Sequence, residues 1–228
     1  MDGTHRASAA WVRSLLTSAQ MTPAGFRTAL LSVPADERDV WLDRVLELGA
    51  IPDDGPHLPR GCVPYLPCSV DALLRMVEYA QVEASDVFVD VGAGVGRAAL
   101  LVHLLTGASA IGLEVQPELV RASRALASRL NVQRYAPVEG DAARLVGDIT
   151  TGSVFFLYCP FSGERLERVL DALEPLARAR PIRVCCVDLP LPRRAWLTPA
   201  SPPDEDLRVY RSTLLDEPTG SALTPSRR

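Results

Sequence analysis

Residues that could do chemistry stand where short apolar runs end in this sequence. The first run, Val87–Val91, carries Asp90 and leads into a turn with three glycines at alternate positions. Three later runs end in carboxylates or aromatic residues. The chemistry-bearing positions are Asp90, Gly92, Glu114, Asp141 and the stretch Tyr158–Phe161. Because ligands of parallel α/β sheets bind at the carboxyl ends of the strands, we expect these residues to form one site.

The glycine turn and the two carboxylates that follow it suit a nucleoside. Gly92 and Gly94 have no side chains, so backbone N–H groups at this turn can approach a bound molecule closely. Glu114 follows Gly94 by 20 residues, at a place where a carboxylate can accept hydrogen bonds from both ribose hydroxyls. Asp141 can accept a hydrogen bond from an adenine amine, and the N–H group of Ala142 can donate one to the ring.

Two residues separate the kinds of nucleoside ligand. Dinucleotide-binding turns follow the pattern G-x-G-x-x-G, but Arg97 takes the place of the third glycine here. Asp90 lies two residues before Gly92, where its carboxylate would repel a pyrophosphate and attract an ammonium group. S-adenosylmethionine (SAM) joins adenine and ribose to an amino acid instead of phosphates. The residues therefore favour SAM, with a nicotinamide dinucleotide as the alternative.

These stretches resemble the motifs of the class I, seven-strand SAM-dependent methyltransferases. Val89–Gly96 is similar to their first motif, Gly112–Val115 to the acidic second strand end, and Val138–Ala142 to the turn that contacts adenine. Tyr158–Phe161 takes the place of the fourth motif, beside the transferred methyl group. By this resemblance the cofactor-binding residues are Tyr65, Asp90, Gly92, Ala93, Gly94, Gly96, Glu114, Asp141 and Ala142, and Tyr158 and Cys159 position the acceptor.

Within this class, a closer resemblance is to the non-SET histone-lysine methyltransferases and their bacterial relatives. It rests on Pro64–Ser69 and Asp86–Asp90, and it implies that the loop around Tyr65 folds over the methionine part of the cofactor. The histone substrate is not carried over, because an acidic chain without lysine lacks the surface of a nucleosome binder. Cys159 also replaces the polar residue with which methyltransferases of DNA adenine or glutamine orient an amine, which disfavours those substrates.

Strands alternate with helices along most of the chain, which predicts a doubly wound α/β fold. The expected strands are 87–91, 108–115, 135–139, 154–159, 182–189 and 207–213. The expected helices are 69–81, 98–105, 117–130 and 163–179, with Pro175 predicted to kink or end the last one. The resemblance implies a Rossmann-like, mostly parallel seven-strand sheet. The Pro-rich stretch after 189 suggests that it is shortened beyond the fifth strand.

Three regions follow from this pattern. Residues 1–58 form an N-terminal helical extension and linker, whose apolar helix faces must pack on the main domain as a structural addition or as a cap over the substrate pocket. Residues 59–216 form the SAM-binding core, and residues 217–228 form a flexible tail.

The composition limits the kinds of partner that we expect for this protein. The 228 residues carry a net charge of −4, and all 24 basic residues are arginines spread among acids, which gives no basic face for DNA or RNA. Five cysteines without C-x-x-C spacing and three histidines do not make a zinc framework, so we expect free thiols, no metal and a cytoplasmic location. No apolar stretch approaches the roughly 18 residues of a membrane span, and no secretory signal is expected.

The sequence thus predicts a SAM-dependent methyltransferase that acts on a small molecule, a peptide or a protein. A nicotinamide-dependent oxidoreductase and a non-catalytic SAM-fold binding protein are the alternatives. The acceptor atom and the oligomeric state are left open.

Overall fold

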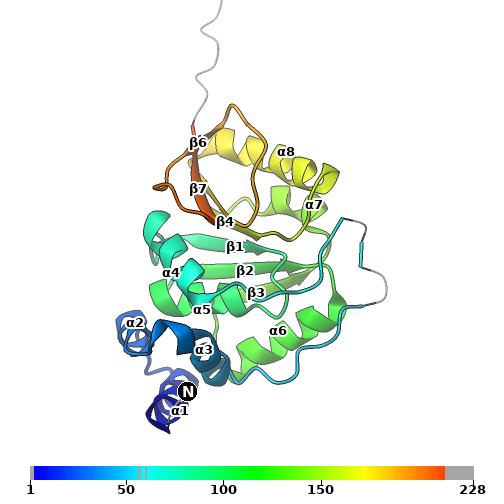
Figure 1. Ribbon diagram of the computed structural model, residues 1–228. Helices are drawn as coiled ribbons and strands as arrows, with labels where there is room; N and C mark the ends of the chain where they lie inside the picture. Colours follow the sequence, from blue (N-terminus) through cyan, green and yellow to red (C-terminus); the bar gives the residue numbers. More distant parts are fainter. Residues whose placement is uncertain (1–2, 56–57, 60, 214–228) are drawn as a thin grey trace, which may run out of the picture.

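A seven-stranded sheet forms the centre of the protein. The structure is a computed structural model that describes residues 3–55, 58–59 and 61–213, so the predicted tail lies outside the described residues. The strand order is β3-β2-β1-β4-β5-β7-β6 (Figure 1). The strands are β1 (Val87–Val91), β2 (Ser109–Glu114), β3 (Tyr135–Glu139), β4 (Val154–Tyr158), β5 (Arg183–Val187), β6 (Leu197–Pro199) and β7 (Leu207–Ser212).

The direction of the strands confirms the predicted fold class. Strands β1 to β5 pair in parallel, and β7 is antiparallel to both β5 and β6. The winding reverses between β1 and β4, which is the place where doubly wound sheets bind ligands. All seven strands are present, and the part that is shortened is the connection from β5 to β6, which contains no helix.

Helices cover both faces of the sheet because the central strands β1, β4 and β5 are apolar on both sides. Phe88 and Phe156 belong to one hydrophobic cluster, and their neighbours Val89 and Phe155 belong to the other. The first face is covered by α4 (Val70–Tyr79), α5 (Arg97–Thr106) and α6 (Pro117–Arg129). The second is covered by α7 (Ala142–Leu145), the 3-10 turn η2 (Val146–Asp148) and α8 (Glu164–Ala179).

Helix α8 contradicts the prediction that Pro175 ends it. The helix continues from Glu164 to Ala179 through the proline. Pro175 is exposed, so the carbonyl group that loses its partner at Asp171, also exposed, can be hydrated. Leu176 and Ala177 are buried against the sheet just beyond the proline, and this packing stabilises the last turn.

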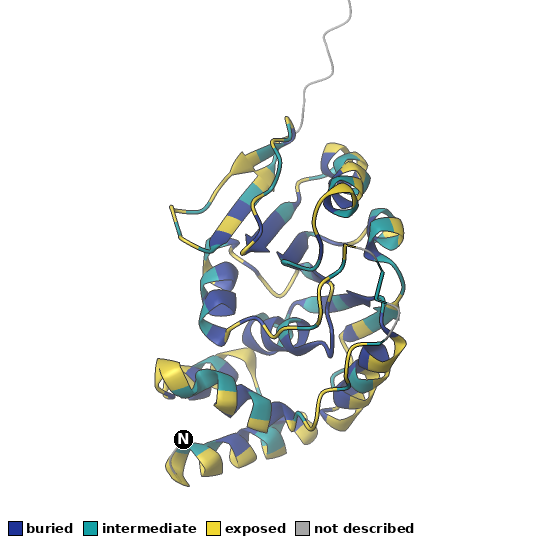
Figure 2. Cartoon of the chain, turned by 45° about the vertical axis from the view of Figure 1, so that its right-hand side comes forward, coloured by how far each residue is buried: buried dark blue, intermediate teal, exposed yellow. Residues whose placement is uncertain are grey.

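The N-terminal extension packs as α1 (Gly3–Thr17), α2 (Pro23–Leu31), the 3-10 turn η1 (Ala35–Glu37) and α3 (Arg38–Leu46). Thr22 caps α2 by accepting a hydrogen bond from the N–H group of Gly25. The rings of Phe26 and Trp41 lie 5.9 Å apart between centroids and join the cluster that includes α4 and α5. Figure 2 shows buried residues on the inner faces of these helices and exposed residues outside.

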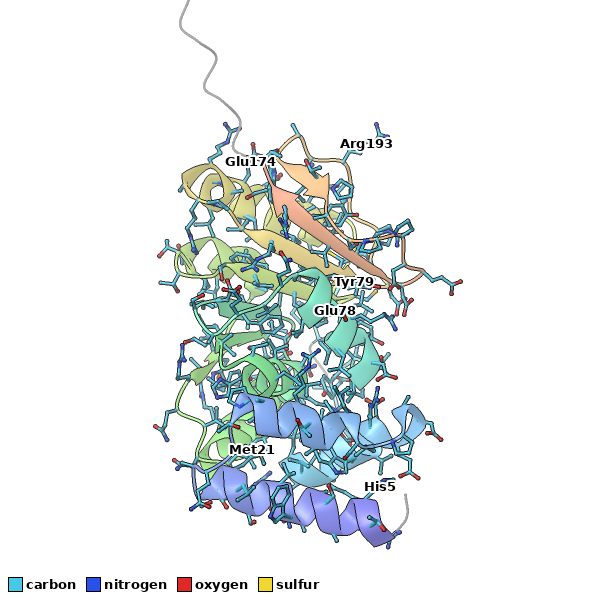
Figure 3. The ribbon with its side chains drawn as sticks, turned by 90° about the vertical axis from the view of Figure 1, so that its left-hand side faces the viewer. His5, Met21, Glu78, Tyr79, Glu174 and Arg193 are labelled. Carbon is cyan, nitrogen blue, oxygen red and sulfur yellow. The ribbon has the colours of Figure 1, made fainter. Side chains whose placement is uncertain are left out.

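The N-terminal extension lies at one end of the molecule. In Figure 3, His5 and Met21 lie at the end formed by the N-terminal helices, and Glu174 and Arg193 lie at the other. Among the described residues, no helix is long and apolar enough to cross a membrane.

Candidate functional site

A cavity of about 500 Å³ lies at the carboxyl edge of the sheet. This volume falls in the range of small-molecule sites. Its lining comes from the strand ends that the sequence singled out, from the segment before α4, from α8 and from the end of β5. The lining residues are Leu58, Cys62–Leu66, Gly92, Leu113–Gln116, Gly140–Ala142, Tyr158–Phe161, Arg165 and Asp188.

Two glycines after β1 are required by close packing. A Cβ at Gly94 would lie 2.0 Å from Cδ2 of Tyr65, and a Cβ at Gly92 would lie 2.6 Å from Cβ of Pro160. Both glycines also have positive φ angles, +55° and +89°, which favour glycine over other residues. The turn therefore holds the ring of Tyr65 directly against the backbone.

Glu114 ends β2 at the wall of the cavity and is fixed by the backbone. Its Oε2 accepts a hydrogen bond from the N–H group of Gly94 at 2.8 Å, and its Oε1 accepts one from Gln116 at 2.8 Å. Burial raises the pKa of Glu114, and these backbone N–H groups oppose that rise. Each carboxylate oxygen has a second lone pair, so both can still accept hydrogen bonds from a ligand.

The segment around Tyr65 is fastened over this wall, and we call residues 58–59 and 61–66 the strap. Asp54, just before the strap, accepts hydrogen bonds from the N–H group of Tyr65 at 3.1 Å and from the side-chain amide of Gln116 at 2.7 Å. Farther along the strap, the N–H group of Val63 donates to the carbonyl of Pro160 at 3.2 Å. The roles of Asp54 and Gln116 could not be predicted from the sequence, because the two residues are 62 positions apart and no local pattern links them.

Tyr65 has a buried hydroxyl group with no hydrogen-bond partner among the described residues. Burial raises the pKa of this hydroxyl, and the carboxylates of Asp90 and Glu114 add to the rise while Arg97 opposes it. A buried phenol without a partner is costly, which makes it a candidate contact for a ligand.

Asp90 lies beneath the turn and does not line the cavity. The residue is only 3% exposed. Burial, followed by the charge of Glu114, raises the pKa of Asp90 to about 7, and the backbone of Ala99 acts to lower it. Contact between Asp90 and an ammonium group, expected from the sequence, stays a prediction. Ala93, Gly94 and Gly96 likewise support the turn without lining the cavity.

Arg97 connects the N-terminal extension to the glycine turn, a role that its place in the pattern G-x-G-x-x-G does not indicate. Its buried guanidinium donates to Asp43 at 2.6 Å, to Asp39 at 2.7 Å and to the carbonyl of Cys68 at 2.7 Å. These contacts join the extension, and the backbone at Cys68 just after the strap, to the glycine turn. Asp39 and Asp43 are four residues apart on one helix face, a signal from which an arginine partner could have been sought.

The described helices of the extension, α1 to α3, supply none of the lining residues. These helices pack mainly against α4 and α5, and the strap lines the cavity instead. The domain boundaries that the sequence suggested stay a prediction.

At the end of β3, Asp141 is held by two partners. It caps α7 by accepting a hydrogen bond from Ala143 at 3.0 Å, and it forms an ion pair with Arg165 of α8. Ala142 opens the helix, where its N–H group has no intrahelical acceptor. Arg165, which sequence analysis did not single out, is the only cation among the described lining residues.

At the ends of β4 and β5, two residues lie side by side in an unusual backbone conformation. Tyr158 pairs with Val187 in the sheet, so Cys159 and Asp188 follow at the same level. Both have positive φ angles, 42° for Cys159 and 51° for Asp188. Such angles are strained for residues other than glycine and occur often at functional sites. Tyr158 is half-buried, and burial raises the pKa of its hydroxyl, with Cys68 and Asp188 adding to the rise.

The described residues contain no group of three or more His, Cys, Asp or Glu side chains that could hold a metal ion. The described cysteines are all free thiols.

Comparison with known proteins identifies the fold. No protein-family model and no curated protein matches the chain. It is similar to the solved structure of an RNA methyltransferase from Salinibacter ruber in complex with S-adenosyl-L-homocysteine, with 27% sequence identity and a TM-score of 0.54; the match covers 68% of this chain and 98% of that one. It is also similar to a putative methyltransferase from Escherichia coli, with 19% identity and a TM-score of 0.55, covering 69% and 91%. The chain therefore has the Rossmann-like fold of class I SAM-dependent methyltransferases.

Proposed function

We propose that this protein is a SAM-dependent methyltransferase. The observation that carries the proposal is Glu114, a carboxylate at the end of β2 whose two oxygens are oriented by the N–H groups of Gly94 and Gln116 on the wall of the cavity. A carboxylate fixed in this way is suited to accept two hydrogen bonds from the vicinal hydroxyls of ribose.

The other polar groups fit the remaining parts of SAM. Asp141 and the N–H group of Ala142 would bind adenine, and Gly92 would allow the backbone to approach the sugar. The unpartnered hydroxyl of Tyr65 and the buried carboxyl of Asp90 would serve the methionine part. In the same proposal the strap covers that part of the cofactor, as in the resemblance to the non-SET histone-lysine methyltransferases and their bacterial relatives.

When bound, SAM supplies a methyl group on a sulfonium for in-line displacement. The protein then has to orient a nucleophile and exclude water, an effect that accounts for much of the rate in such reactions. Tyr158 and Cys159, next to the wall formed by Pro160 and Phe161, would position that nucleophile.

The acceptor in this proposal is a small molecule, a peptide or a protein. The similar protein from Salinibacter ruber is an RNA methyltransferase, but RNA binding depends on cationic contacts to phosphates. The single cation of the described lining, Arg165, is already paired with Asp141. This charge distribution argues against RNA as the acceptor, and free thiols are consistent with a cytoplasmic setting.

Titration calorimetry tests the proposal. The protein should bind S-adenosylhomocysteine and should bind NAD much more weakly. Absence of heat with S-adenosylhomocysteine at millimolar concentration would refute the proposal, and preferential NAD binding would replace it with the oxidoreductase.

Turnover separates an enzyme from a binding protein with the same fold. Release of S-adenosylhomocysteine from SAM in the presence of pooled small molecules and peptides supports the enzyme. Tight cofactor binding with no release from any pool favours the non-catalytic alternative.

A further inference from the structure

The cavity has two ends that differ in charge. Glu114 and Asp141 stand at the ends of β2 and β3, and the one lining cation, Arg165, pairs with Asp141 there. At the other end, Asp188 follows β5. Its carboxylate has no ion pair or side-chain hydrogen bond among the residues that the structure describes, and it is exposed. The second end therefore presents one free negative charge.

The backbone fixes where this charge lies. The N–H group of Asp188 donates to the carbonyl of Asp206 at 2.9 Å, and its φ angle of 51° turns the chain sharply at the strand end. Tyr158 and Val187 are register partners in the sheet, so the residues that follow them, Cys159 and Asp188, lie side by side. The proximity of Asp188 to Tyr158 is also evident in the raised pKa of the Tyr158 hydroxyl, to which the Asp188 carboxylate contributes.

The cavity lining that includes Asp188 also contains apolar and aromatic side chains. Tyr158 and Phe161 line the cavity from the β4 side, and Val63 and Leu66 line it from the strap. Val63 and Leu66 are large hydrophobic side chains that are 44% and 64% exposed. Aromatic rings and a carboxylate attract a cation, and the aliphatic side chains can cover an apolar frame.

We propose that the methyl acceptor is an amine on an apolar small-molecule frame, and that Asp188 binds its ammonium form at the cavity wall. This inference rests on the proposed methyltransferase function and names its substrate class. With Glu114 and Asp141 assigned to the cofactor, an anionic acceptor would meet the carboxylate of Asp188 and no unpaired cation among the described lining residues, and this repulsion disfavours carboxylates and phosphates.

The chemistry balances with one proton released. The ammonium gives up a proton, by way of Asp188, to solvent. The nitrogen lone pair then forms a bond to the methyl carbon while the carbon–sulfur bond breaks, with both electrons going to sulfur. The products are the methylated ammonium and S-adenosylhomocysteine. Asp188 is well placed for the first step because it is both exposed to water and part of the lining.

The experiment uses matched probes on the full-length protein with S-adenosylhomocysteine present. Each of three frames, phenylethyl, indolylethyl and hexyl, is supplied as a primary amine, an alcohol and a carboxylate, and affinity is measured by calorimetry. The amine should bind most tightly on at least one frame and lose affinity as salt is raised. Asp188→Asn, which keeps the shape and tolerates the left-handed backbone, should weaken amine binding by about fivefold and leave the alcohol unchanged.

Glu205→Gln is the matched control. Glu205 is an exposed acid in the segment before β7, it does not line the cavity, and its neutralisation removes the same charge. Amine affinity in this variant should equal that of the unmodified protein.

Several outcomes overturn the acceptor inference while the proposed function stands. They are S-adenosylhomocysteine binding without any preference for an amine, equal amine affinity in Asp188→Asn and Glu205→Gln, and methylation of an RNA oligonucleotide with no amine bound. Absence of S-adenosylhomocysteine binding instead refutes the proposed function.

Discussion

The two sides of the cavity are built differently. On the side of β1 and β2, the charged groups are tied to the backbone or to one another: Glu114 to two N–H groups, and Arg97 to two carboxylates and a carbonyl. On the side of β4 and β5, Cys159 and Asp188 hold strained backbone angles, and the Asp188 carboxylate has no partner among the described residues. The first side is preorganised for one constant ligand. The second leaves polar and apolar groups available for an acceptor.

The pH dependence of stability gives the largest expected effect on the fixed side. The pKa of Asp90 is about 7 in the fold, against about 3.9 when unfolded, so the folded state holds its proton longer. The free energy of unfolding should therefore fall as the pH rises from about 4 to about 7, by at most about 4 kcal/mol, and then level off. Urea titrations at several pH values measure this decrease.

The Asp90→Asn variant should lack this component of the pH profile and should be the more stable protein above pH 7. Parallel profiles for the two proteins would show that Asp90 is ionised in the fold, and the buried carboxyl would then need another partner.

Removal of the Arg97 contacts should come next in size. Arg97→Met leaves the buried carbonyl of Cys68 without a donor and separates α3 from the turn, so the free energy of unfolding should drop by about 3 kcal/mol. Chemical denaturation measures the loss. Arg121→Met is the control, since Arg121 is exposed on α6 and its one ion pair within the described part of the chain is with Glu118, and it should change stability by less than about 0.5 kcal/mol. Similar losses of unfolding free energy in both variants would contradict the inference that the contacts of Arg97 tie the β1 and β2 side of the cavity together.

Glu114→Gln should weaken S-adenosylhomocysteine binding by about 2 kcal/mol, because an amide lacks the charge that strengthens hydrogen bonds to ribose. Calorimetry measures the affinity. Glu139→Gln is matched to it, because Glu139 is the register partner of Glu114 on β3, is exposed and does not line the cavity. Unchanged affinity in Glu114→Gln would contradict the assignment of the ribose contact.

Tyr65→Phe should give the smallest effect, with opposite signs in two measurements. Removal of an unpartnered buried hydroxyl should raise the free energy of unfolding of the ligand-free protein by about 1 kcal/mol. S-adenosylhomocysteine affinity should fall by a similar amount if the hydroxyl contacts the ligand. A variant that loses stability would show that the hydroxyl already has a partner in the free protein.

Local patterns in the sequence were enough to predict the fold and the strand ends. The strand predicted at 135–139 coincides with β3, and the helix predicted from residue 69 is α4, which Ser69 caps by accepting a hydrogen bond from the N–H group of Ala72 at 3.2 Å. These features depend on neighbours a few residues apart, and periodicity and capping preferences report them directly.

Features that depend on distant contacts could not be predicted. Arg97 contacts residues 54 and 58 positions earlier in the chain, and although Asp39 and Asp43 share a helix face that suits an arginine, nothing in the sequence indicates which arginine binds there. The burial of Asp90 depends on the packing of α5 over β1, and its spacing before Gly92 says nothing about which way its carboxyl faces. Pro175 lies inside α8 because buried leucine and alanine follow it, which is a matter of tertiary packing.

The connection from β5 to β6 runs from residue 188 to residue 196 without a helix, and Asp188 begins it. Surface connections accept insertions at small entropic cost, and this one borders the acceptor side of the cavity but not the network around Glu114. Lengthening or exchanging this single loop can thus change which acceptor the proposed enzyme binds. Under the proposed function, this connection is the natural place for evolution or engineering to change the acceptor without rebuilding the proposed cofactor side.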